Sequence, residues 1–304
     1  VMDMFRNPKL AAAAYACQQE NIPVLEITSS MDIGESQDLT YPIYQVYENT
    51  GKLVNITSID SRFDIGQDNE KLNSNSYMSY IILHQPNFLF NYTNIGYQNY
   101  YIDNQNIELM KDLLFDVHRI GNIKSNIEIT EPLLRNADII SIDTSAFCAA
   151  DAPGVKHNSP NGFSSEDGCK MTRYAGLNAK LTSIGFFEYN PKYDINNITA
   201  NTLSQMIWYF IEGFSLRIND FPSHENKDFK RYIVKMDDVD DEIIFLCHKV
   251  SGKCCPKRFG QLHCNRLRRL RHSHCLRNKD RQRTDRHRCF RQSQTAVNGR
   301  ICPG

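Results

Sequence analysis

The chain has 304 residues and no formal net charge, because 35 Lys and Arg balance 35 Asp and Glu. No apolar run approaches the ~18 residues that a membrane-spanning helix requires, so we expect no membrane partner. No Gly-rich phosphate motif follows any predicted strand, which leaves a nucleotide-binding role with little support.

The charge is unevenly distributed along the chain. Residues 1–246 contain 19 Lys and Arg against 33 Asp and Glu, whereas residues 247–304 contain 16 against 2. The second stretch also holds seven of the ten cysteines and five of the nine histidines. This abrupt change predicts a boundary near residue 246, with an α/β domain before it and a basic, non-globular tail rich in Cys, His and Arg after it.

Three interpretations of the tail, residues 247–304, remain open. It contains no CxxC pair, and its Cys and His spacings fit no zinc finger or ribbon. Its clustered arginines suit a nucleic-acid arm, but no periodic apolar face accompanies them. We therefore favour a frame-shift artefact over a disordered basic tail or a zinc or nucleic-acid module, and expect no nucleic-acid partner.

Strand and helix patterns alternate along the first 246 residues. Short runs rich in β-branched residues predict strands, and longer segments with apolar positions at helical spacing predict helices. This alternation predicts a mostly parallel sheet covered by helices on both faces. In chain order we expect a helix at 8–20, a strand at 22–27, a helix at 38–47, strands at 53–60 and 88–98, helices at 107–119 and 128–135, a strand at 137–143, a helix at 165–175, a strand at 181–188 and a helix at 199–214.

Four carboxylates lie at the ends of the predicted strands. Asp60 and Asp64 follow the strand at 53–60, while Asp143 and Glu188 close two later strands. Ligand-binding residues of open α/β sheets gather at the carboxyl ends of the strands. We therefore expect these four side chains to converge on one crevice, with the Pro- and Gly-containing loop 151–163 as one of its walls.

The residues around these carboxylates resemble a known family, the ureohydrolases, which comprise the arginases, agmatinases and formimidoylglutamases. The resemblance covers residues 21–213 and is closest to a divergent formimidoylglutamase-like branch. It implies a three-layer arginase-like α/β fold, here truncated at its N-terminus, and hydrolysis of a linear amidine C–N bond by a hydroxide between two Mn²⁺ ions. The matching segments, in order, are Gly34-Glu35-Ser36-Gln37-Asp38, Asp60-Ser61-Arg62-Phe63-Asp64, Asp143-Thr144-Ser145 and Glu188-Tyr189-Asn190-Pro191.

The resemblance also implies roles for individual residues. Asp60, Asp64 and Asp143 match metal ligands, and Glu188 matches the acid that holds the amidine nitrogens of the substrate. Three positions depart from the family pattern. Gln37 replaces the histidine of the first metal, Arg62 the histidine of the second metal, and Ser145 a chelating aspartate.

These departures leave one metal position with three carboxylates and the Gln37 carbonyl oxygen. The other position loses both of its private ligands and gains the permanent charge of Arg62. We expect at most one Mn²⁺, or none, with the Arg62 guanidinium paired to Asp60 and Asp143 in its place. The histidines at 84, 118, 157 and 224 fall in no metal spacing.

Two classes of function follow. The first is a formimidoylglutamase- or arginase-like hydrolase that is weak or inactive. The alternative is a non-catalytic binding or scaffold protein that keeps the crevice. The partner is then a small amidine-type substrate or a carboxylate ligand, and a homo-oligomer stays open. Cys17, Cys148 and Cys169 are too few for a disulfide framework, so we expect a cytoplasmic location.

Overall fold

The computed structural model describes residues 24–29, 37–66, 71–218, 228–236, 239–250 and 254–256. The helix predicted at 8–20 and the segment Gly34–Ser36 lie outside these residues. The chain divides into two compact units, Val1–Arg217 and Ile218–Gly304, and each is described by itself.

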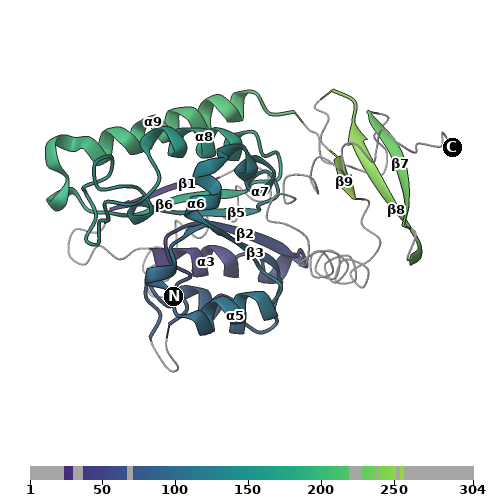
Figure 1. Ribbon diagram of the computed structural model, residues 1–304, viewed down its shortest axis with the longest axis horizontal. Coiled ribbons are helices and arrows are strands. Elements are labelled where there is room, and N and C mark those ends of the chain that lie inside the picture. The colour runs from purple at the N-terminus through teal and green to yellow at the C-terminus, as the bar shows by residue number, and fades with distance from the viewer. Residues whose placement is uncertain are drawn as a thin grey trace. The chain divides into compact units, whose positions relative to one another are not determined.

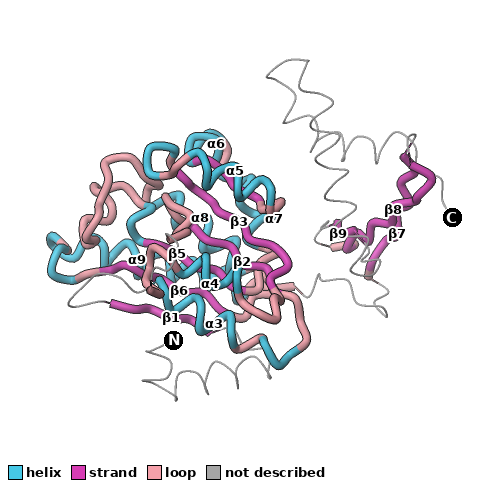
Figure 2. Tube along the Cα trace, turned by 90° about the horizontal axis from the view of Figure 1, so that it is seen from below, coloured by secondary structure: helices cyan, strands magenta, loops and turns pink. Residues whose placement is uncertain are grey.

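A six-stranded parallel sheet forms the centre of the first unit (Figures 1 and 2). The middle strands β2 and β5 are buried along their whole length, as expected for a parallel sheet covered on both faces. The α/β class and the mostly parallel sheet are thus confirmed. In spatial order the strands are β1 (Val24–Ser29), β6 (Ser183–Tyr189), β5 (Ile139–Asp143), β2 (Val54–Ile59), β3 (Leu89–Tyr97) and β4 (Asp116–Arg119).

Helices cover the two faces of this sheet in separate layers (Figure 1). Beneath one layer lies an apolar core that includes Met171, Met206 and Phe210. Beneath the other lies a core richer in tyrosine, with Tyr44, Tyr77 and others. The first layer contains α6 (Ile120–Ser125), α7 (Thr130–Leu134), α8 (Ser165–Gly176) and α9 (Ile198–Ser215), and the second contains α3 (Thr40–Gln45), α4 (Tyr77–Leu83) and α5 (Asn104–Asp112). The three-layer arrangement agrees with the sequence prediction.

The helix predicted at 107–119 is wrong in its second half. Helix α5 ends at Asp112, and Leu114 has a left-handed backbone with φ of 61°. The chain then enters β4, in which Val117 lies opposite Asn94 of β3. The apolar positions at 113, 114 and 117 fit a helix and a turn followed by a strand equally well, and the sheet decides between them.

The second unit contains a three-stranded antiparallel sheet in the order β7-β8-β9. Its strands are β7 (Phe229–Met236), β8 (Val239–His248) and β9 (Cys254–Pro256). Strand β8 runs across position 246, but residues 257–304 lie outside the described part of the chain. The interpretation of the tail therefore stays a prediction.

Two further observations concern the cysteines and the possibility of a membrane-spanning helix. Cys148 and Cys169 are free thiols, whereas Cys247 takes part in a disulfide bond. Within the described ranges, no helix combines the length and the apolar character needed to cross a membrane.

Candidate functional site

The carboxyl ends of β2, β5 and β6 bring together the predicted site residues. Asp60 directly follows β2, Asp143 ends β5, and Glu188 is the penultimate residue of β6. The register pairs Ile59 with Ile142 and so places the ends of β2 and β5 side by side. The topology of the parallel sheet therefore accounts for the convergence.

Two of these carboxylates sit on unusual backbone. Asp64 has φ of 50° and Glu188 has φ of 66°, in the left-handed region that residues other than glycine rarely adopt. Such conformations cost roughly 1–3 kcal/mol and persist only where the surrounding structure enforces them. The fold therefore holds both side chains at this pocket against a local backbone preference.

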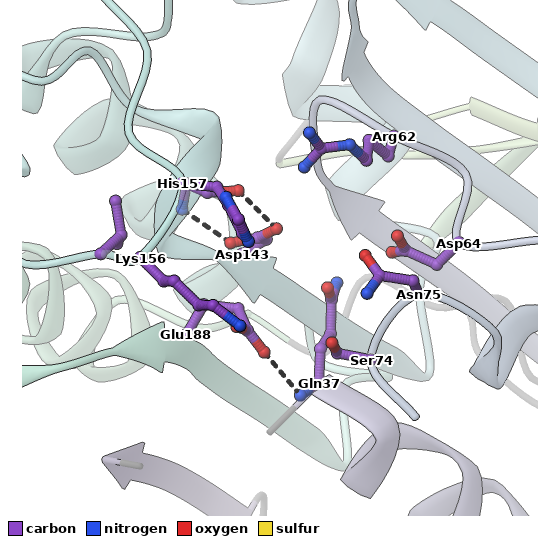
Figure 3. Close-up of a pocket in the computed structure, with 11 residues that line it drawn as sticks. Gln37, Arg62, Asp64, Ser74, Asn75, Asp143, Lys156, His157 and Glu188 are labelled. Atoms are coloured by element: carbon purple, nitrogen blue, oxygen red, sulfur yellow. Dashed lines mark hydrogen bonds between the residues drawn. The ribbon is translucent and has the colours of Figure 1, made fainter. Parts of the chain in front are cut away.

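The convergent residues line a small pocket with a volume of about 20 Å³ (Figure 3). Six of its lining residues were singled out from the sequence, namely Gln37, Arg62, Asp64, Asp143, Ser145 and Glu188. Asp60 lies fully buried behind the lining. Five lining residues were not assigned to the site from the sequence: Ser74, Asn75, Val155, Lys156 and His157.

The remaining lining residues come from two loops. Val155, Lys156 and His157 belong to the loop 151–163, which was expected to form a wall of the crevice without any named residue. Ser74 and Asn75 lie just before α4, in the segment 73–77, which the family resemblance matches to a substrate-side loop without its usual histidine. No residue of either loop was given a role, because loop packing rather than spacing brings them to the pocket.

Gln37, at the start of the short 3-10 helix η1 (Gln37–Leu39), links four parts of the fold. Its Nε2 donates to Asp60 Oδ2 at 3.1 Å, Ser141 Oγ at 3.1 Å and Tyr77 OH at 3.3 Å. Its backbone N–H donates to Glu188 Oε1 at 3.1 Å. Because the amide nitrogen faces a carboxylate, the amide oxygen is left facing away from Asp60.

Asp60 and Asp64 form a coupled carboxyl pair. Asp60 Oδ1 accepts the Arg62 N–H at 2.7 Å, and a hydrogen bond joins the Asp60 and Asp64 carboxyl groups. Burial raises the pKa of Asp60, although bonds from Asp64, the Arg62 N–H and Gln37 oppose the rise. Burial, followed by the charge of Asp60, raises the pKa of Asp64 well above its ordinary value. The two carboxyl groups therefore titrate as a pair.

Asp143 is satisfied by its own turn, the 3-10 helix η5 (Thr144–Ala146). The Ser145 N–H donates to Asp143 Oδ1 at 2.6 Å, and Ser145 Oγ donates to Oδ2 at 2.7 Å. Burial and the charges of Asp60 and Glu188 raise the pKa of Asp143 well above its ordinary value, while the two Ser145 bonds oppose the rise. The hydroxyl of Ser145 therefore donates a hydrogen bond to a carboxylate oxygen that would otherwise be available to a ligand.

Arg62 does not make the expected ion pairs. Its guanidinium lies over the Tyr101 ring, 4.5 Å from the ring centroid, and within the described residues no ion pair joins it to Asp60, Asp64 or Asp143. Asn94 Nδ2 donates to the Arg62 carbonyl at 2.8 Å and holds the backbone in place. Figure 3 shows the Arg62 side chain apart from Asp143 and Asp64. The expected pairing is therefore corrected to a cation–π contact.

These residues do not fit a two-metal centre. In the part of the chain that the structure describes, no three His, Cys, Asp or Glu side chains are grouped so that they could hold a metal ion. Arg62 and Ser145 offer no anionic oxygen or imidazole at the second position. The oxygens of Asp60 and Asp143 all accept hydrogen bonds already.

The fold and the site can be compared with known proteins. A family model described as the arginase family matches residues 18–212. No curated protein matches the chain.

Solved structures with a similar fold share little sequence with the chain. Formiminoglutamase from Trypanosoma cruzi with Mn²⁺ superposes with a TM-score of 0.61 at 14% identity, covering 69% of this chain and 71% of that one. Formimidoylglutamase from Bacillus subtilis gives 0.56 at 14%, covering 68% and 66%. A hypothetical agmatinase from Burkholderia thailandensis gives 0.56 at 16%, covering 69% and 64%. At such identities the likeness concerns the fold, and the family model extends over most of the first unit, so the chain belongs to the arginase family.

Proposed function

We propose that this chain is a formimidoylglutamase-like member of the arginase family whose two-metal hydrolysis is weak or absent. The observation that supports the proposal is the set of contacts made by Arg62 and Ser145, the residues at two of the replaced metal-ligand positions. Arg62 is turned onto Tyr101, and Ser145 is hydrogen-bonded to Asp143. A hydroxide held between two dications needs several anionic ligands around both ions, and these two residues supply none.

The pocket retains features of a binding site for a small polar molecule. Glu188 is positioned by its bond from the Gln37 N–H and lines the pocket together with Asp64 and Asp143. These carboxylates suit an amidine-type substrate. Arg62 lies at the same pocket and suits a carboxylate, so binding without catalysis remains the alternative function.

The proposal includes three narrower statements. Either one Mn²⁺ binds, held by Asp60, Asp64, Asp143 and the Gln37 carbonyl oxygen, or none does. The protein acts in the cytoplasm on a small molecule, with no nucleic-acid partner. Self-association into a homo-oligomer is compatible with this function.

The test is the Mn²⁺ content of the full chain, purified with Mn²⁺, desalted and analysed for metal. Release of product from formimidoylglutamate, arginine and agmatine is measured on the same sample. We expect no more than one ion per chain and no turnover above the metal-free control. Two ions per chain together with turnover would overturn the proposal.

A further inference from the structure

One buried oxygen atom at the pocket receives no hydrogen bond. Asp64 is 7% exposed, and its Oδ2 has no hydrogen-bond partner. Gln37 lines the same pocket, and its side-chain bonds to described residues run through Nε2, which leaves Oε1 as an acceptor. A buried acceptor without a donor is costly, so Asp64 Oδ2 points to a ligand that donates N–H or O–H groups.

The charge at the floor of the pocket indicates the sign of that ligand. Asp64 and Asp143 line the floor, and Asp60 lies directly behind them. The Arg62 guanidinium, stacked on Tyr101, forms no ion pair with any of the three. All three carboxylates are buried, and a bound cation would offset the repulsion between them.

The size of the pocket suits a small cationic group. Its volume of about 20 Å³ exceeds the ~10–15 Å³ that one water needs. An alkyl ammonium head is about as large as a water molecule and donates three hydrogen bonds.

Three acceptors are available for those three donors. Asp64 Oδ2 has no donor, Gln37 Oε1 is left as an acceptor, and a carboxylate such as Asp143 accepts about four bonds in total, of which Ser145 supplies two. The three residues come from different elements and all line the pocket (Figure 3).

We propose that this pocket binds the primary ammonium group of an aliphatic amine directly through Asp64, Gln37 and Asp143, without a metal ion. The inference rests on the proposed function in its metal-free form, because even one Mn²⁺ ion would occupy the same carboxylates and the Gln37 oxygen. The amine is either a free small molecule or the side chain of a lysine in a peptide.

The test is calorimetric titration of the full chain in EDTA with n-butylammonium chloride. Tetramethylammonium chloride at equal ionic strength carries the charge without N–H donors, and acetamidinium chloride carries planar donors. Saturable binding of n-butylammonium alone or most tightly supports the inference. No saturable binding, or equal binding of tetramethylammonium, overturns it. A lysine-containing peptide and its acetyl-lysine counterpart then separate the two sources of the amine.

Variants assign the binding to the pocket. Asp64→Asn removes the anionic acceptor and should weaken n-butylammonium at least about tenfold, the size expected for a hydrogen bond to a charged group. Asp112→Asn, on the exposed end of α5, is the matched control and should change nothing. Asp143→Asn provides a second test if Asp64→Asn fails to fold. Unchanged affinity in a folded pocket variant overturns the inference.

The Mn²⁺ content of the same preparation separates the two proposals. Two ions per chain together with turnover would overturn the proposed function whatever the amines do. Fewer than two ions without amine binding would overturn the ammonium site alone.

Discussion

The neighbouring strands β5 and β2 each end at a buried carboxylate, but the two carboxylates receive different hydrogen bonds. At the end of β5, Asp143 is satisfied by Ser145, two positions along the chain. At the end of β2, one oxygen of Asp60 likewise accepts an N–H two positions along, from Arg62. Its other oxygen depends on Gln37, 23 positions away, which is also bonded to Ser141 and Tyr77. A local arrangement forms wherever its turn forms, whereas a long-range one requires the whole layer to be assembled. The β2 side should therefore be the more sensitive to change.

The largest effect is expected from restoring the family residues on both sides at once. The triple variant Gln37→His, Arg62→His and Ser145→Asp supplies two imidazoles and a carboxylate, and should raise the Mn²⁺ content to two ions per chain. Metal analysis after desalting measures this. Adding Asp143→Asn is the control and should remove the gain. A triple variant that is folded but metal-free would show that the ligand alignment is wrong.

Gln37→Ala tests the long-range side alone. It leaves Asp60 Oδ2 without its donor and opens a cavity, so we expect a loss of about 2–4 kcal/mol in the free energy of unfolding. Urea denaturation measures the loss, and Gln205→Ala on the exposed face of α9 is the control. A loss as small as that of the control would mean that Gln37 does not hold the layer together.

Ser145→Ala tests the local side and should cost about 1.5 kcal/mol at pH 8, because Asp143 loses one of its donors. The pKa of Asp143 is raised in the folded state. Its contribution to stability is therefore full below the unfolded pKa of about 4 and is lost as the pH rises through the folded value. The variant raises that folded pKa further and extends the loss to higher pH.

The difference between wild type and Ser145→Ala should accordingly be largest at pH 8 and shrink toward pH 4. Denaturation midpoints across this range measure it. A difference that grows as the pH falls would contradict the assigned role of the hydroxyl.

The smallest effect concerns Arg62. Its guanidinium contacts Tyr101 and makes no ion pair with the aspartates, although its charge opposes the rise in the pKa of Asp60 and of Asp64. A double-mutant cycle of Arg62→Ala and Tyr101→Leu should give a coupling of about 0.5–1 kcal/mol, typical of a partly exposed cation–π contact. Thermal or urea unfolding of the four proteins measures it. If Arg62→Ala costs far more while Tyr101→Leu costs nothing, the guanidinium pairs with the aspartates after all.

The sequence predicted the central strands well, because fully buried parallel strands are continuous runs of apolar and β-branched residues. The predicted strand at 53–60 is observed at Val54–Ile59, and the one at 181–188 at Ser183–Tyr189. Helix α4 and the end of α5 were not predicted, because their short apolar segments carry no distinct period. Long buried elements can thus be predicted from the sequence, whereas short elements depend on the residues against which they pack.

For the site, the sequence predicted which residues meet but not how they are oriented. The convergence of Asp60, Asp143 and Glu188 follows from parallel strands that end at one edge of the sheet. The direction of Arg62 depends on Tyr101 and on the bond from Asn94, which are remote in sequence. No spacing rule contains that information.

The hydrogen bonds of Gln37 also bear on whether histidine could return to this position. Its amide group provides two N–H donors toward Asp60, Ser141 and Tyr77. A neutral histidine, which the family resemblance places here, carries a single ring N–H. A step back to histidine alone would therefore lose a structural bond before any metal compensated for it. A change from histidine to glutamine at position 37 therefore adds a structural hydrogen bond, whereas the reverse change alone removes one.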